Sequence, residues 1–261
     1  MAGSEGLLAA NEPSPVRVLR EGGGSDFVLT ADHAGRLIPR RLGLLGVPEG
    51  ELSRHIAWDI GIAGVTEHLS AALDAVAVLQ AYSRLVIDCN RDPAVQSSIP
   101  EISELTPIPA NVAMADTDRV ARVREIFAPY HARIAALLDA RAAAGRRSVL
   151  IAMHSFTPVF KGESRAVQVG VLFNRDARLA STLLALLRAE GDLIVGENAP
   201  YAITDTSDYT VPVHGEKRGL AHVEIEIRQD LIADAAGQSA WAARFARLLP
   251  AADAAMRAGS A

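Results

Sequence analysis

The chain has 261 residues, of which 49% are hydrophobic and 22% charged, a composition typical of a folded protein and not of a disordered one. Its formal charge of -5 gives no excess of Lys and Arg, which argues against nucleic acid as a partner. The single cysteine, Cys89, excludes an intramolecular disulfide and a zinc site built from several thiolates. The sequence shows no signal-peptide pattern at its start and no apolar run of about 18 residues, so we expect a cytoplasmic protein without a membrane partner.

The first half of the sequence predicts a tail followed by strands, a helix and a long loop. Residues 1–24 are rich in Gly, Ser, Pro and Glu, and we expect a flexible tail there, with a single domain over residues 25–261. Residues 93–116 contain several prolines and little periodicity, which predicts a long loop that could cover a site. The other elements expected here are a strand over 26–31, a helix around 60–73, strands over 76–82 and 84–90, and a helix from Asp118 to Gly145 that Pro129 should kink.

The second half continues the alternation of strands and helices. A strand over 148–153 runs directly into His154, and residues 196–219 form a loop rich in Gly, Pro and Tyr. The remaining elements are strands over 166–173, 193–198 and 221–228 and helices over 177–190 and about 239–256. This alternation predicts one α/β domain with a mostly buried sheet.

Two of the seven histidines, His33 and His154, follow predicted strands and have small neighbours that leave room for a ligand. A zinc ion bound by nitrogen and oxygen ligands typically uses three protein groups and leaves a fourth position for water, so a carboxylate is also needed. Asp59 in HIAWDIG is the candidate, although an Asp at a helix start fits an N-terminal cap equally well. His55 lies four residues earlier and is the alternative ligand.

Other histidines have simpler interpretations. His68 and His131 lie in amphipathic helical patterns, where a solvated or capping histidine is expected. In AHVEIEIR, alternation with a period of two places Glu224 and Glu226 on one face with His222, and the aliphatic residues on the other. The acidic face is typical of a solvated face on an antiparallel strand, but a glutamate beside a zinc-bound water would instead be a general base.

Four arginines, Arg84, Arg91, Arg165 and Arg175, lie at predicted strand ends or loop edges. Each fits a solvated rim. An enzyme that acts on an acidic substrate, however, needs a fixed guanidinium, because its planar fork binds a carboxylate through two charge-assisted hydrogen bonds.

The order of the motifs resembles a known family. The segments DHAGRLIP, HIAWDIG, YSRLVIDCNR, HSFTP, VGVLFNRD, GENAPY and HVEIEIRQDL follow one another between residues 32 and 231, and together they resemble the N-formylglutamate amidohydrolase family. That family is similar to the zinc carboxypeptidases and related deacylases. The resemblance implies a three-layer α/β sandwich with a central mixed, mostly parallel sheet and helices on both faces.

The resemblance also implies roles for individual residues. His33 and His154 match two zinc ligands of the wider group, and Glu226 matches the catalytic glutamate in its Glu-aliphatic-Arg setting. Asn90 and Arg91 match a pair that contacts the substrate carboxylate, and Arg84 and Arg175 are further candidates for substrate binding. The carboxypeptidases have a glutamate ligand where this chain has Arg36, so the third ligand is expected to be Asp59, with His55 as the alternative.

These residues predict zinc-dependent hydrolysis of an N-formyl or N-acyl amino acid, with N-formyl-glutamate as the substrate that the resemblance implies. Zinc lowers the pKa of its bound water and polarises the amide carbonyl, while Glu226 accepts the proton from that water. A zinc peptidase for short acidic or cell-wall peptides is an alternative, and a loop over 93–116 would then leave an open cleft. A metal-free protein that binds small molecules on the same fold is a third hypothesis.

Overall fold

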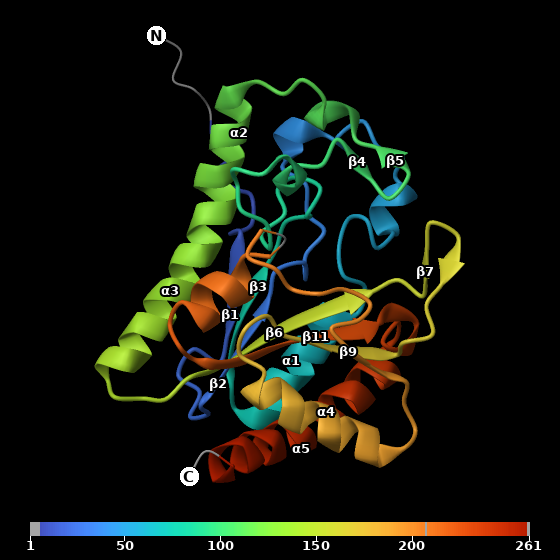
Figure 1. The fold of residues 1–261 in the computed structure, drawn as a ribbon. Coiled ribbons are helices and arrows are strands. Elements are labelled where there is room, and N and C mark those ends of the chain that lie inside the picture. The colour runs from blue at the N-terminus through green and yellow to red at the C-terminus, as the bar shows by residue number, and fades with distance from the viewer. Residues whose placement is uncertain (1–5, 207, 260–261) are drawn as a thin grey trace.

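The computed structural model describes residues 6–206 and 208–259 and is built on one seven-stranded mixed sheet (Figure 1). In their order across the sheet, the strands are β1 (Val16–Leu19), β3 (Val76–Gln80), β2 (Phe27–Ala31), β6 (Val149–Phe156), β11 (Ala221–Arg228), β9 (Val169–Leu172) and β10 (Val195–Glu197). Strands β3, β2, β6 and β11 are parallel, β1 and β9 run antiparallel to β3 and β11, and β10 is parallel to β9. The expected mixed, mostly parallel sheet is therefore confirmed.

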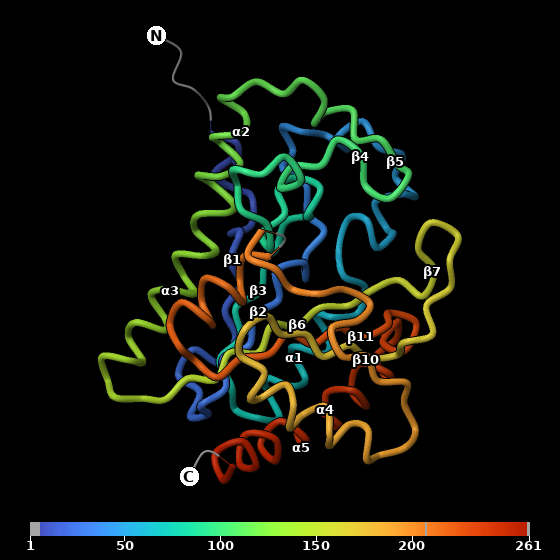
Figure 2. The backbone as a smooth tube through the Cα atoms, viewed as in Figure 1, coloured from blue at the N-terminus to red at the C-terminus, as the bar shows by residue number. Residues whose placement is uncertain are grey.

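Helices cover both faces of this sheet, which gives three layers (Figures 1 and 2). On one face lie α1 (Ile62–Leu73), α4 (Arg178–Glu190) and α5 (Ala235–Ala258), whose apolar side chains share one core with the sheet. The other face is covered mainly by α3 (Ala128–Ala143), which continues from α2 (Asp116–Arg122) through the π-helix η5 (Val123–Phe127). None of the helices in the described ranges is long and apolar enough to cross a membrane.

Alternation along the central strands assigns side chains to the two faces. On β6, Ile151 and Met153 belong to the core shared with α1, α4 and α5, whereas Leu150 packs on the side of α3. Further along that second face the side chains become polar. On β6 the face carries Leu150 and then, toward the carboxyl end, His154, and on β2 it carries Val28 and then Thr30. The side of the sheet that faces α3 is thus apolar at the amino ends of its strands and polar at the carboxyl ends.

The connecting segments contain short elements. The small hairpins are β4 (Ile102–Ser103) with β5 (Thr106–Pro107), and β7 (Val159–Phe160) with β8 (Glu163–Ser164). The 3-10 helices are η1 (Arg40–Leu42), η2 (Glu51–Ser53), η3 (Gln96–Ser98), η4 (Pro109–Asn111) and η7 (Gln229–Leu231), and η6 (Val211–Glu216) is a second π-helix. The loop predicted over 93–116 is therefore divided into several short elements.

Two sequence-based predictions of local structure were wrong. Residues 16–19 lie in the segment expected to be a flexible tail, but they form β1, which pairs with β3 along its full length. Residues 84–90, expected to be a strand, form turns after β3, because their apolar side chains pack beneath loops instead of joining the sheet. Residues 1–5 of the expected tail lie outside the described residues.

The predicted break in the long helix occurs just before Pro129. The π-helix η5 ends at Phe127, and Pro129 is in the first turn of α3. Because α2, η5 and α3 are contiguous, Pro129 lies inside one helical segment, and the wider π-helical turn before it accommodates its ring and its missing N–H. The irregular turn therefore lies on the N-terminal side of the proline.

Candidate functional site

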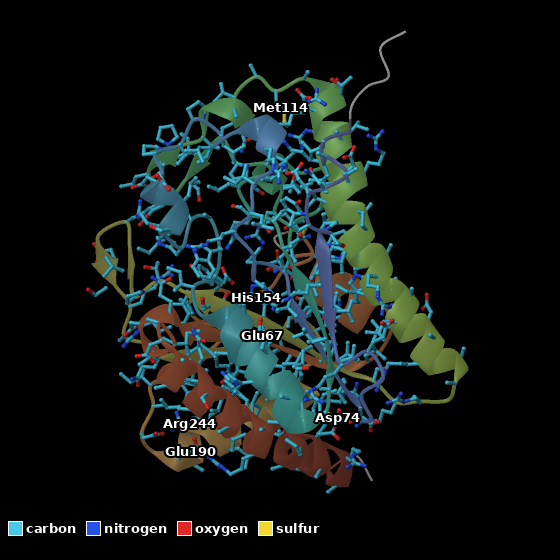
Figure 3. All side chains as sticks on the ribbon, turned by 180° about the vertical axis from the view of Figure 1, so that it is seen from behind. Glu67, Asp74, Met114, His154, Glu190 and Arg244 are labelled. Carbon is cyan, nitrogen blue, oxygen red and sulfur yellow. The ribbon has the colours of Figure 1, made fainter. Side chains whose placement is uncertain are left out.

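The polar side chains meet where the parallel strands end. His33 follows β2, His154 lies within β6, and Asp59 lies in the turn that precedes α1. Gly35 allows the chain after His33 to pack closely, since a Cβ atom there would lie 2.0 Å from the carbonyl oxygen of Ala81. In Figure 3, His154 lies near the centre of the molecule.

His33, Asp59 and His154 form a buried group that could hold a metal ion. One ligand atom from each lies within 4.8 Å of the others, and each residue is at most 3% exposed. The Nδ1 atom of His33 is 3.5 Å from Oδ2 of Asp59, and the Nδ1 atom of His154 is 3.1 Å from the same oxygen. The three residues that the sequence predicts as metal ligands therefore lie together in the structure.

The Nδ1 atom of His33 fits the chemistry of a metal ligand. It is buried, and it has no hydrogen-bond partner in the part of the chain that the structure describes. An unpaired buried ring nitrogen costs free energy, whereas coordination of a metal would satisfy it. The donor set of two imidazoles and one carboxylate suits zinc and leaves a further position open.

Two more carboxylates lie beside the imidazole rings. The Nε2 atom of His33 lies 2.7 Å from Oδ1 of Asp88, and Arg84 donates to Oδ2 of Asp88 through Nη2 at 2.7 Å. On the other ring, Nε2 of His154 lies 3.5 Å from Oδ2 of Asp32. Metal-binding histidines usually direct the nitrogen that is not coordinated toward a carboxylate, which fixes the tautomer.

Helix α3 supports the carboxylate beside His154. The hydroxyl of Tyr130 donates a 2.6 Å hydrogen bond to Oδ1 of Asp32, and both residues are buried. Asp32 and Asp88 were not predicted as site residues. The available signals were their positions directly before His33 in DHAG and within the VIDCNR segment.

The structure does not support a helix-cap role for Asp59 or a ligand role for His55. The helix α1 has Gly61 at its N-terminal cap position, and Asp59 makes no side-chain capping bond to it but accepts from the N–H of Ser155. His55 lies outside the buried group, with Nε2 3.5 Å from Oε2 of Glu104. Arg36 stacks over the ring of Trp58 at 5.1 Å, so the position occupied by a glutamate ligand in carboxypeptidases is directed elsewhere.

The charges of the group stabilise one another. Burial by itself would raise the pKa of Asp59, but His33 and His154 outweigh it, so this pKa is lowered. Burial would likewise lower the pKa of His154, yet the surrounding carboxylates raise it well above its ordinary value. The buried carboxylates therefore favour positive charge at the two imidazoles, where a divalent cation could bind in place of the ring protons.

Glu224 and Glu226 lie in this site. Both are buried, and they point from β11 to the polar face described above. Glu226 is the register partner of His154, whereas Glu224 is opposite Ala152. Burial raises the pKa of each glutamate to about 8, in the protein without a metal ion.

The interpretation of this strand's acidic face as a solvated face was wrong. The acidic face is not solvated, because β11 lies inside the sheet between β6 and β9 and its glutamates are covered. Glu224 does not pair with Arg228, whose side chain instead donates to Asp230 and to the carbonyl of Arg165.

The group opens into a cavity of about 420 Å³, which three of the four candidate substrate-binding residues line. Arg91 reaches it from the turn after Asn90, with Nη1 3.4 Å from Oδ1 of Asp208. The oxygen of the Asn90 side chain accepts the N–H groups of Tyr209 and Thr210, so this amide holds two loops together. Arg84 also lines the cavity, but its Nε and Nη2 atoms both donate to Asp88.

Arg175 is the fourth candidate, and the structure places it elsewhere. Its side chain is 55% exposed, pairs with Asp205 and Glu216, and lines a different surface depression. Arg165 does not line the cavity either, but it donates to the hydroxyl of Tyr201, which does. His68 is exposed, as expected, whereas His131 is buried against His214, contrary to the expectation of a solvated residue.

The fold and site together define an α/β protein with a buried group suited to a divalent metal. The chain matches the N-formylglutamate amidohydrolase family over residues 25–233 and therefore belongs to it. Family membership implies a hydrolase.

Solved structures show the same architecture. A gene product from Agrobacterium tumefaciens is 38% identical, with a TM-score of 0.92 over 96% of this chain and 99% of that one. The N-formylglutamate amidohydrolase from Ralstonia eutropha JMP134 is 18% identical, with a TM-score of 0.69 over 95% of this chain and all of that one, and this likeness concerns the fold. A search of curated proteins gives no match.

Proposed function

We propose that this protein hydrolyses the amide bond of an N-formyl or N-acyl amino acid with the help of a zinc ion, and that N-formyl-glutamate is its substrate. The observation that carries the proposal is the alignment of the buried Glu226 with His154, beside the group formed by His33, Asp59 and His154. Membership of the N-formylglutamate amidohydrolase family supports the choice of substrate.

The chain supplies the ligands and the proton acceptor. His33, Asp59 and His154 would hold the zinc ion, and Asp88 and Asp32 would keep the two imidazole rings in place. When bound, zinc supplies a water of lowered pKa and polarises the carbonyl of the substrate. The carboxylate of Glu226 would be kept ionised by the charge of a bound zinc ion, so that it could accept a proton and deliver it to the departing amine.

Arg91 is proposed to bind the carboxylate of the substrate. It lines the cavity and is only partly exposed, so its guanidinium can meet a carboxylate with little competition from bulk water. Asn90 holds the loop that carries Arg91, and Arg84 keeps Asp88 charged and in place, since this arginine lowers the pKa of Asp88. Asn90 thus serves substrate binding indirectly, whereas Arg84 supports the metal-binding group through Asp88.

A substrate panel tests the proposal. Purified protein without a His tag would be assayed for zinc content and then with N-formyl, N-acetyl and longer N-acyl derivatives of Glu, Gln and Leu. We expect about one zinc per chain and the highest kcat/KM for N-formyl-glutamate. Release of amino acids from short acidic peptides alone would favour the zinc peptidase. Protein with well under one equivalent of zinc and no turnover would favour the metal-free binding protein.

A further inference from the structure

Glu104 is a buried carboxylate at the tip of a hairpin that has no core of its own. The hairpin of β4 and β5 has two residues in each strand, and such a short hairpin is not stable by itself. Its tip contains Glu104 and Leu105, and Leu105 is 74% exposed while the Glu104 side chain is 8% exposed. A charged side chain is seldom buried unless it is paired.

Both oxygens of Glu104 are bound by other segments. Oε1 accepts a 3.0 Å hydrogen bond from the N–H of Lys161, which is at the tip of the hairpin of β7 and β8. Oε2 accepts from Nη2 of Arg54, which follows the 3-10 helix η2. Arg54 therefore joins a third segment to the same carboxylate, and it also pairs with Glu51 within that segment.

The two hairpins lie over the candidate site. Figure 1 shows β4, β5 and β7 along the same side of the molecule, and Figure 2 shows the same arrangement. Ile102, Ser103 and Glu104 from the first hairpin and Phe160 from the second line the same cavity as His33 and Glu226. Their contact through Glu104 is therefore part of the cavity wall.

We propose that Glu104 fastens the two hairpins together over the cavity and thereby limits the size of the acyl group that can reach the metal-binding group. The limit on acyl size rests on the proposed function, whereas the restricted access of reagents to the cavity does not. Glu104 does not touch the reacting atoms in this scheme and is a positioning residue that determines specificity.

Access to the cavity can be measured without any activity. Thr157 lines the cavity and is buried, and the native Cys89 is fully buried, so Thr157→Cys provides a single reporter thiol. Its rate of alkylation would be measured with the small reagent iodoacetamide and with the bulkier N-phenylmaleimide. Both rates would be compared between Thr157→Cys alone and Thr157→Cys combined with Glu104→Ala.

Loss of the Glu104 contacts should increase the alkylation rate more for the bulky reagent than for the small one. We expect Glu104→Ala, which removes the contacts with both Lys161 and Arg54, to raise the rate with N-phenylmaleimide by about tenfold or more, since loss of one charge-assisted hydrogen bond alone shifts an opening equilibrium by about that factor. The rate with iodoacetamide should rise less. Glu101→Gln removes an exposed carboxylate from the same loop and should change neither rate.

A second variant and the acyl panel complete the test. If Glu104→Ala does not fold, Arg54→Met removes the other side of the ion pair and should give a smaller increase, since the Lys161 contact remains. In the panel, Glu104→Ala should narrow the preference for formyl over benzoyl glutamate by about tenfold in kcat/KM, while Glu104→Gln, which keeps an acceptor oxygen, should recover part of it. Unchanged alkylation rates would overturn the proposal, even if the wild-type protein cleaves N-formyl-glutamate. If the alkylation rates change as expected but no N-acyl amino acid is cleaved, only the proposed function would be overturned.

Discussion

Glu226 and Glu224 are both buried on one face of β11, but they differ in their distance along the strand from the carboxyl end. Glu226 is level with His154 and two residues nearer to that end, where the cavity opens. Glu224 lies deeper, with Oε2 3.8 Å from Nε2 of His154, on the ring edge away from Asp59. This position suits a residue that balances charge better than one that moves a proton.

The first prediction separates these glutamates. Glu226→Gln keeps shape and hydrogen bonding but removes the proton acceptor, so kcat should fall by about a hundred to ten thousand fold while zinc content stays normal. Glu224→Gln should lose much less. Measurement of kcat and zinc content for both variants checks this. Near-normal kcat for Glu226→Gln together with an inactive Glu224→Gln would show that the general base is Glu224.

A second prediction concerns Arg91. Arg91→Lys retains the charge but cannot form the two-pronged contact with a carboxylate, so KM should rise by about tenfold with little change in kcat. Steady-state kinetics on N-formyl-glutamate, with an uncharged N-formyl ester as control, measures the effect. Equal KM values for the variant and the wild type on every carboxylate substrate would assign the guanidinium a structural role beside Asp208.

At the scale of elements, α3 connects to the site at two points. Tyr130 donates to Asp32, and the next residue, His131, contacts the carbonyl oxygen of Cys89 through Nε2 at 2.7 Å. Because Cys89 is adjacent to Asp88, the helix supports the carboxylates on both imidazole ligands. The helix thus serves the site although it supplies no ligand.

The third prediction tests this support. Tyr130→Phe removes one hydroxyl and leaves Oδ1 of Asp32 without its donor, which should weaken zinc affinity by about ten to a hundredfold with a smaller effect on folding. Competition with a zinc-binding dye measures the affinity. Tyr209→Phe is a matched control, since its ring packs on Phe127 and His131 but its hydroxyl is remote from Asp32. Equal zinc affinities for both variants would contradict the role of α3.

A fourth prediction concerns the buried pair of His131 and His214. Since Nε2 of His131 donates to Cys89, Nδ1 of His131 accepts the N–H of His214 at 3.0 Å. Burial, aided by the neighbouring His131, lowers the pKa of His214 to about 3. The unfolded chain binds this proton with a pKa near 6.5, so the contribution to stability is complete above that pH and is lost as the pH falls toward 3.

Replacement of His214 should therefore flatten the acid side of the stability profile. His214→Gln keeps an N–H donor but does not titrate, so its loss of unfolding free energy between pH 7 and pH 5 should be smaller than that of the wild type by about 2 kcal/mol. Urea unfolding at both pH values gives this difference. Parallel profiles for the two proteins would show that His214 is not the group responsible.

At the scale of the whole molecule, the sheet is held between two helical layers, and the site lies where strands from distant parts of the sequence end. The layer of α1, α4 and α5 is joined at its surface by ion pairs such as Arg244 with Glu190, at 2.9 Å (Figure 3). The metal-binding group lies on the opposite side of the sheet and joins β2, β6 and the turn before α1. A metal ion would therefore cross-link three segments.

The fifth prediction follows from that cross-link. A ligand that binds only the folded state stabilises it by about 2.7 kcal/mol at a hundredfold excess over Kd, which corresponds to roughly 5–10 °C in Tm. Removal of zinc with a chelator should lower Tm accordingly, and addition of zinc should restore it. His33→Ala should lose this response, whereas His68→Ala should keep it, because His68 is exposed on α1. A zinc response in His33→Ala would place the metal elsewhere.

The sequence by itself determined the α/β class and the order of the motifs, and the resemblance that these motifs carry implied the mostly parallel sheet. Hydrophobic alternation is a local property, so β2, β3, β6 and β11 and the helices α1, α4 and α5 could be recognised from short windows. His33 and His154 could be selected because each stands beside a recognisable strand. Local patterns also explain the errors, since the apolar run at 84–90 satisfies the same pattern as a strand but packs beneath loops.

Only the tertiary structure decided which groups meet. Whether Asp59 is a helix cap or a metal ligand depends on His154 in β6, which is 95 residues away in sequence. The Oδ2 atom of Asp59 lies 3.1 Å from Nδ1 of His154. The position of Arg175 outside the cavity, the burial of Glu226 and the contact of Glu104 with Lys161 depend on the same kind of long-range approach. A carboxylate has similar local signals whether it is solvated or buried, and its environment is set by segments that pack on it from distant parts of the chain.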